Sequence, residues 1–280
     1  MIKLTINSNG KIEAAQQDIS PTVYLDHRAL RTFSEKTTLA GRLASALKSR
    51  GGTLALSVLN LAEFTKVKAT QQAQEAENLI EAILPNVFFL EFEPFAVIAR
   101  EDALLAGEPP VAPHADVDFL RVFAGLKPDS VNPFTAHNLF AAVQKQQLAT
   151  RLDGLADTIV DRVETLRDTL DVDDGFRSRV KGLPPGSQIQ RGTRIILREL
   201  VRSFLVDRKT KITRNHAVDL LHAVVPVAYC DIVLLDKHWE TQVERARARL
   251  DRVGVSAPIA KVFSGKGDGI DRFLYELEWG

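Results

Sequence analysis

The hydrophobic positions of the chain form five short, continuous runs separated by longer amphipathic stretches. Continuous apolar runs are typical of strands in a parallel sheet covered on both faces, because both rows of side chains are then buried. The intervening stretches have the length and spacing of helices, so the pattern predicts repeated β-α units. The predicted strands are residues 21–26, 53–60, 86–92, 230–236 and 258–264.

Helices are predicted between these strands and near the C-terminus. One spans 29–50 and ends at two glycines, a second spans 61–84 and ends at Pro85, and a third spans 268–277. Glycine and proline are common where helices stop. At the N-terminus, apolar and polar residues alternate over 1–14 around Ser8-Asn9-Gly10, which predicts a β-hairpin.

Residues from about 100 to 210 do not show this alternation of strands and helices, and they contain no convincing strand. Apolar residues recur at spacings of three and four between Leu152 and Leu170, and again between Ile195 and Leu205, which predicts two helices. We therefore predict an α/β domain formed by 1–105 and 210–280, with a mostly helical insertion over 106–209. The sheet is expected to have five mainly parallel strands with helices on both faces.

Composition narrows the function classes. Lys and Arg total 36 and Asp and Glu total 36, so the formal net charge is zero. This excludes a strongly basic nucleic-acid coat but leaves room for a local basic patch. The single cysteine excludes an intramolecular disulfide and a cysteine-based zinc cluster. No apolar run reaches the ~20 residues of a membrane span, and the N-terminus lacks an apolar signal core, so a soluble, cytoplasmic protein without a membrane partner is expected.

Four carboxylates follow predicted strands or open predicted helices. Asp26 and Asp236 end the first and fourth strands, Glu63 lies in the first turn of the helix after the second strand, and Asp219 lies in the helix before the fourth strand. Ligands of such sheets bind beyond the carboxyl ends of the strands. Converging carboxylates in apolar surroundings need a cation, and hard oxygen donors suit Mg²⁺ or Mn²⁺. A bound ion of this kind can activate water for phosphodiester hydrolysis.

Each of these acids also has a purely structural interpretation. An aspartate after a strand is often the N-cap of the next helix or part of a turn. The set of four in this order favours the catalytic interpretation over the structural one.

The residues around these acids resemble the PIN-domain nucleases, including the VapC-like ribonuclease toxins of toxin–antitoxin modules. The matching segments are 23–26 (VYLD), 56–64 (LSVLNLAEF), 217–223 (AVDLLHA) and 229–239 (YCDIVLLDKHW), and 86–104 is similar to the third strand and next helix of the family. The resemblance implies a Rossmann-like PIN fold and hydrolysis of single-stranded or looped RNA. It implies that Asp26 and Asp219 hold Mg²⁺ or Mn²⁺ most directly, with Glu63 and Asp236 completing the site.

The chain departs from the family pattern in two places. The family often has Thr or Ser two residues before its last aspartate, where this chain has Leu234, and the small toxins lack an insertion of about 100 residues. An antitoxin or other regulatory protein, or a homodimer, is an expected partner by the same resemblance. The leading hypothesis is a metal-dependent endoribonuclease, and the alternative is a PIN-like RNA- or protein-binding regulatory module with little catalysis.

Two sets of residues are candidates for contacting RNA. Lys237 and Trp239 follow Asp236, where a cation could meet phosphate and an indole could stack on a base, although Trp239 could instead cover the sheet edge. A basic stripe could track phosphates toward the acids, pair with the acidic stripe of 153–171, or form an arm for a partner or a second copy. The basic stripe consists of Arg191, Arg194, Arg198 and Arg202.

Two further polar residues near the acids are expected to lie outside the metal site. Asp231 begins the same strand that Asp236 ends, and five residues at ~3.3 Å each separate them by about 16 Å. His222 is expected to be a buried, hydrogen-bonded histidine facing the sheet, because His216 and His222 point in different directions from one helix.

Overall fold

The centre of the protein is a five-stranded sheet in which every strand pair is parallel. The computed structural model describes residues 1–6, 8, 12–66, 70–107, 112–125, 143, 148–183, 192–255 and 257–280. The strand order is β5-β4-β3-β6-β7. The strands are β3 (Thr22–Leu25), β4 (Thr53–Ser57), β5 (Val87–Leu90), β6 (Ile232–Leu235) and β7 (Lys261–Ser264).

All five predicted strands are confirmed, each within the predicted range. Every residue of β3, β4, β5 and β6 is buried. This burial on both faces explains why the runs are continuously apolar. The predicted N-terminal hairpin is also confirmed: β1 (Ile2–Ile6) pairs antiparallel with β2 (Ile12–Gln16) in a separate two-stranded sheet.

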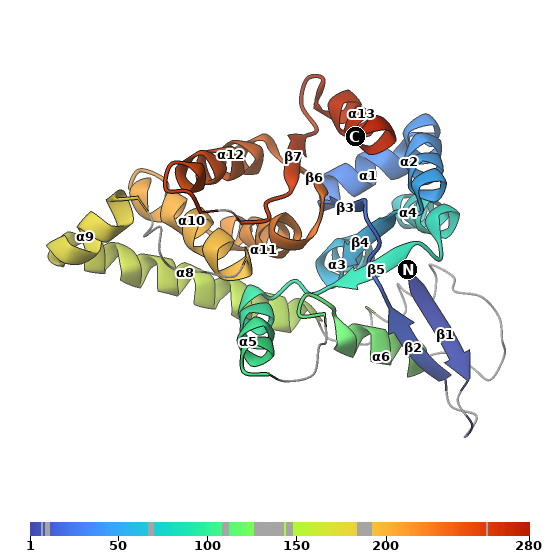
Figure 1. Cartoon of the computed structure of the whole chain (residues 1–280), viewed down its shortest axis with the longest axis horizontal. Coiled ribbons are helices and arrows are strands. Elements are labelled where there is room, and N and C mark those ends of the chain that lie inside the picture. The colour runs from blue at the N-terminus through green and yellow to red at the C-terminus, as the bar shows by residue number, and fades with distance from the viewer. Residues whose placement is uncertain are drawn as a thin grey trace.

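Helices cover both faces of the central sheet. In Figure 1 the sheet lies between α1, α2, α4 and α13 on one side and α10, α11 and α12 on the other. The helices before the insertion are α1 (His27–Glu35), α2 (Thr37–Arg50), α3 (Val58–Lys66), α4 (Thr70–Ile83) and α5 (Pro94–Leu105). The helices after it are α11 (Arg214–Tyr229), α12 (Lys237–Asp251) and α13 (Gly269–Trp279).

The segment predicted as an insertion is mostly helical in its described residues. Its helices are α6 (Val117–Gly125), α8 (Leu148–Val172), α9 (Asp174–Lys181) and α10 (Gly192–Val206). Helices α8 and α10 pack directly on α11, and α10 also packs on α5 and α12. Buried residues from α8 and α10 belong to the same hydrophobic core cluster as the sheet. Helices α8 and α10 are therefore built into the core, and α8, α9 and α10 lie on the side of the molecule away from the hairpin, whereas α6 packs against β2 (Figure 1).

Two predicted helices differ from the observed ones. The helix expected over 29–50 is two helices, because Lys36 adopts an extended backbone (φ −114°, ψ 100°) between α1 and α2. The helix expected over 61–84 is also two, α3 and α4, with residues 67–69 between them outside the described part. In the described part of the chain, no helix is long and apolar enough to cross a bilayer.

Candidate functional site

The candidate site lies between β3 and β6, where the order in which the chain adds strands to the sheet reverses. The chain passes outward from β3 through β4 to β5, and later from β6 to β7 on the other side of β3. The crevice between two such strands, at their carboxyl ends, is where open α/β sheets bind ligands. Asp26 directly follows β3 and Asp236 directly follows β6, and the Asp26 amide donates to the Leu234 carbonyl at 3.0 Å.

Asp26 and Asp236 both act as helix N-caps. Asp26 Oδ1 accepts from the Ala29 amide at 2.7 Å, and Asp236 Oδ1 accepts from the Trp239 amide at 2.9 Å. The structural role expected of such aspartates is therefore present at both positions. Within the described residues, Oδ2 of each carboxylate takes part in no hydrogen bond, so capping leaves one oxygen of each available.

The electrostatics of Asp26 reflect its burial and the charges near it. The pKa of Asp26 is raised to about 6, mainly by burial and to a smaller extent by the charges of Asp236 and Asp219. The Ala29 hydrogen bond and the charge of His222 act in the opposite direction. The charges of Asp236 and Asp219 therefore act on Asp26, more weakly than its burial does.

A buried polar network holds the ends of β3 and β4 beneath these acids. Asn60 is fully buried; its Nδ2 donates to the Leu25 carbonyl and its Oδ1 accepts from the Ser57 amide, both at 2.9 Å. Ser57 also lies 3.4 Å from the Tyr24 hydroxyl, which is 2.6 Å from His222 Nδ1. The prediction of a buried, hydrogen-bonded His222 is confirmed, and Asn60 is a positioning residue that the sequence pattern did not single out.

Glu63 is placed differently from the expectation. Strand β4 ends at Ser57 rather than at residue 60, so Glu63 is the sixth residue of α3 and not in its first turn. Its side chain is outside the described part of the structure. Among the side chains that are described, no three histidines, cysteines, aspartates or glutamates are arranged to hold a metal ion.

The residues next to Asp236 in the sequence have different positions and partners. Asp231 is exposed at the start of β6, where its Oδ2 accepts from the Thr22 amide at 2.7 Å, so it lies at the opposite edge as predicted. Trp239 is only 3% exposed and meets Phe204 of α10 edge-on, with ring centroids 5.7 Å apart. This burial favours a packing role for Trp239, while Lys237 is exposed and bonded to Glu240 at 2.6 Å.

The described part of the basic stripe lies on α10. Arg194 pairs with Asp102 of α5, Arg198 lies 3.6 Å from Glu199, and Arg202 donates to the Val180 carbonyl. Arg191 is outside the described residues. In the described part, two acids of α8 pair with arginines outside the stripe: Asp157 with Arg214 and Asp171 with Arg208.

Comparison with known proteins adds no relative: no family model, curated protein or solved structure matches the chain. The chemistry of the site is therefore argued from its own geometry.

Proposed function

We propose that the protein is a metal-dependent endoribonuclease of the PIN type. The observation that carries the proposal is the placement of Asp26 and Asp236 after the neighbouring strands β3 and β6, at the point where the strand order reverses, with Asp219 near enough for its charge to act on Asp26. Like charges held together in a partly buried site are stabilised by a cation. The local resemblance of all four acidic segments to PIN nucleases supports the same chemistry.

The donor set suits Mg²⁺ or Mn²⁺. Asp26, Asp219 and Asp236 offer carboxylate oxygens only, which are the ligands that these hard cations prefer. Asp26 and Asp236 each keep one oxygen outside their capping bond in the described structure, and Glu63 is a fourth candidate. The ion would supply a water of lowered pKa and stabilise the charge that develops on the phosphate.

The protein's own residues fix the orientation of this site. The N-cap hydrogen bonds fix the orientation of the Asp26 carboxylate and of the Asp236 carboxylate. Asn60 links the end of β3 to the first turn of α3 by donating to the Leu25 carbonyl. Leu234, which stands where the family often has a hydroxyl, is fully buried in β6. The site therefore relies on carboxylates, without a hydroxyl from that position.

Cleavage of RNA tests the proposal directly. Unstructured and structured RNA pools are incubated with the protein in Mn²⁺, Mg²⁺ or EDTA. We expect metal-dependent cleavage that falls at least ~100-fold in Asp26→Asn and in Asp236→Asn, since both substitutions remove a charged ligand but keep a capping oxygen.

Asp231→Asn is the matched control, because it removes a carboxylate from the same strand as Asp236 at the opposite edge. Its activity should stay within about twofold of wild type. If folded wild-type protein binds RNA as tightly as Asp26→Asn and neither cuts it, the protein is a binding module and the nuclease proposal fails.

A further inference from the structure

A large cavity lies between α5, α8, α9, α10, α11 and α12, and none of the four predicted acids is among its described lining residues. Its volume is about 940 Å³, at the upper end of the range for small-molecule sites. The apolar part of its wall includes Ile159, Val163, Leu166, Leu197, Val201 and Leu205.

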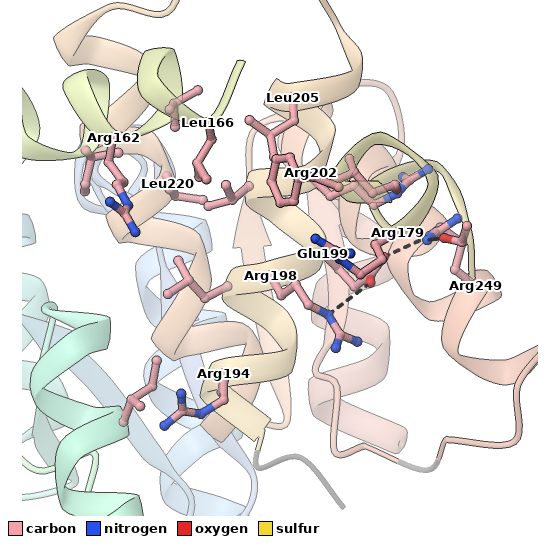
Figure 2. Close-up of a pocket in the computed structure, with 18 of the residues that line it drawn as sticks. Arg162, Leu166, Arg179, Arg194, Arg198, Glu199, Arg202, Leu205, Leu220 and Arg249 are labelled. Atoms are coloured by element: carbon pink, nitrogen blue, oxygen red, sulfur yellow. Dashed lines mark hydrogen bonds and ion pairs between the residues drawn. The ribbon is translucent and has the colours of Figure 1, made fainter. Parts of the chain in front are cut away.

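The charged part of the wall is almost entirely basic. Among the described residues that line the cavity, Glu199 is the only carboxylate. Figure 2 shows arginines from α8, α9, α10 and α12 around the apolar side chains. They are Arg162, Arg179, Arg194, Arg198, Arg202 and Arg249.

Arg194 pairs with Asp102 of α5, a residue that does not line the cavity, and the single carboxylate of the cavity does not balance the other five arginines. Glu199 is buried between Arg249, at 2.9 Å, and Arg198, at 3.6 Å (Figure 2). Burial and the nearby charge of Arg249 lower the pKa of Arg202, with Glu199 opposing them. In the described structure neither Arg162 nor Arg179 forms a hydrogen bond or an ion pair, and Arg179 lies only over the ring of Phe176. Positive charge therefore remains uncompensated beside an apolar wall.

We propose that this cavity binds an anionic amphiphile: a single aliphatic chain carrying a phosphate head group. The chain would lie along the apolar wall, and the head group would meet the guanidinium groups at the rim. Guanidinium forks match phosphate oxygens in geometry, and a phosphate monoester carries close to two negative charges at neutral pH. The two negative charges of a phosphate monoester match the excess positive charge of the arginines better than the single charge of a carboxylate does. The site is independent of the proposed nuclease chemistry.

Calorimetric titration with dodecyl phosphate, below its micelle concentration, tests the proposal. Dodecyl phosphate should bind at least ~10-fold more tightly than butyl phosphate, which lacks the long chain. It should also bind at least ~10-fold more tightly than dodecyltrimethylammonium, which has the opposite charge, and more tightly than dodecanoate.

Three substitutions locate the binding. Arg162→Glu and Arg198→Glu should each weaken dodecyl phosphate binding at least ~10-fold, and Leu197→Trp should abolish it by filling the cavity. Arg28→Glu makes the same charge change on an exposed residue of α1 that does not line the cavity, and should change affinity less than twofold. Arg162 is exposed, so its variant remains informative if Leu197→Trp fails to fold.

Several results would overturn the proposal. Equal affinity for the cationic amphiphile would mean nonspecific apolar binding, and unchanged affinity in both arginine variants would place the ligand elsewhere. A preference for dodecanoate would reject the phosphate head group. Binding of an acidic amphipathic peptide but not of dodecyl phosphate would make the cavity a protein-docking groove instead.

Discussion

At the scale of single residues, Asp26 combines two roles that usually oppose each other. Its carboxylate caps α1, which favours the charged form, yet burial and two neighbouring aspartates favour the neutral form and raise its pKa to about 6. The order of the acids could be predicted from the sequence, because each follows an apolar run. The environment of Asp26 could not be predicted, because Leu234, His222 and Asp236, which act on it, are about 200 residues away in the sequence.

The raised pKa of Asp26 predicts a stability change in Asp26→Asn. Between about pH 4 and pH 6 the native state holds a proton on Asp26 that the unfolded state releases, so this residue makes the protein less stable as pH rises through that window. Asparagine can still cap α1. Without metal, Asp26→Asn should match wild type below pH 4 and be roughly 1–3 kcal/mol more stable above pH 6 by denaturant unfolding.

Asp116 provides the control for this measurement. Burial and Glu91 raise its pKa to about 6 as well, and it accepts from the Phe119 amide in the first turn of α6. Asp116→Asn should therefore show a similar pH dependence. Adding Mn²⁺ should reduce the advantage of Asp26→Asn but leave that of Asp116→Asn unchanged. An equal response of both variants to Mn²⁺ would argue against metal binding at Asp26.

At the scale of elements, apolar periodicity located the helices but not all of their ends. The break at Lys36 contains neither glycine nor proline, and the Lys36 side chain makes no capping hydrogen bond. The local sequence therefore gave no sign of a helix end at this position. Strand β4 was predicted three residues too long, because Val58 and Leu59 continue the apolar run while already belonging to α3. Trp239 is covered by Phe204 of α10, a contact that periodicity within one element cannot reveal.

Arg167 of α8 shows how one element fixes the end of another. It is only 6% exposed, and its guanidinium donates to the carbonyls of Phe204, Asp207 and Thr210, at and beyond the end of α10. These include carbonyl groups that a helix leaves without internal partners. The side chain therefore acts as a C-terminal cap supplied by a neighbouring helix.

Replacing Arg167 should be costly. Arg167→Ala should lower the free energy of unfolding by about 2–4 kcal/mol, because it leaves buried carbonyls without a charged donor. Arg167→Lys should recover only part of this loss, since an ammonium lacks the planar fork. Arg121→Ala, which removes an exposed arginine paired with Asp118 on α6, should cost no more than about 0.5 kcal/mol. A similarly small cost at Arg167 would contradict the capping role.

At the scale of the whole molecule, the sheet and the hairpin differ in how they are held. Strand β3 is paired on both sides and buried on both faces, whereas β1 and β2 pair only with each other as strands. The alternating and continuous apolar patterns distinguished these two sheets from the sequence alone. How closely α8 and α10 join the core was not predictable, because it depends on contacts with α11 and α12.

Hydrogen exchange should separate these two parts. We expect the amides of Val23 and Tyr24 to exchange only through global unfolding, and those of the hairpin to exchange at least ~100-fold faster through local opening. Mass spectrometry of peptides covering 1–16 and 20–30 measures both rates in one sample. Equal protection would mean that the hairpin opens only together with the sheet.

The pairing of β3 with β6 also has a consequence for biosynthesis. The ribosome makes Asp26 well before Asp236, which follows α11. The nascent chain can pair β3 with β4 well before β6 has left the exit tunnel. Asp236 joins Asp26 only after β6 has emerged, so a chain that stalls before β6 lacks this carboxylate and its effect on the pKa of Asp26.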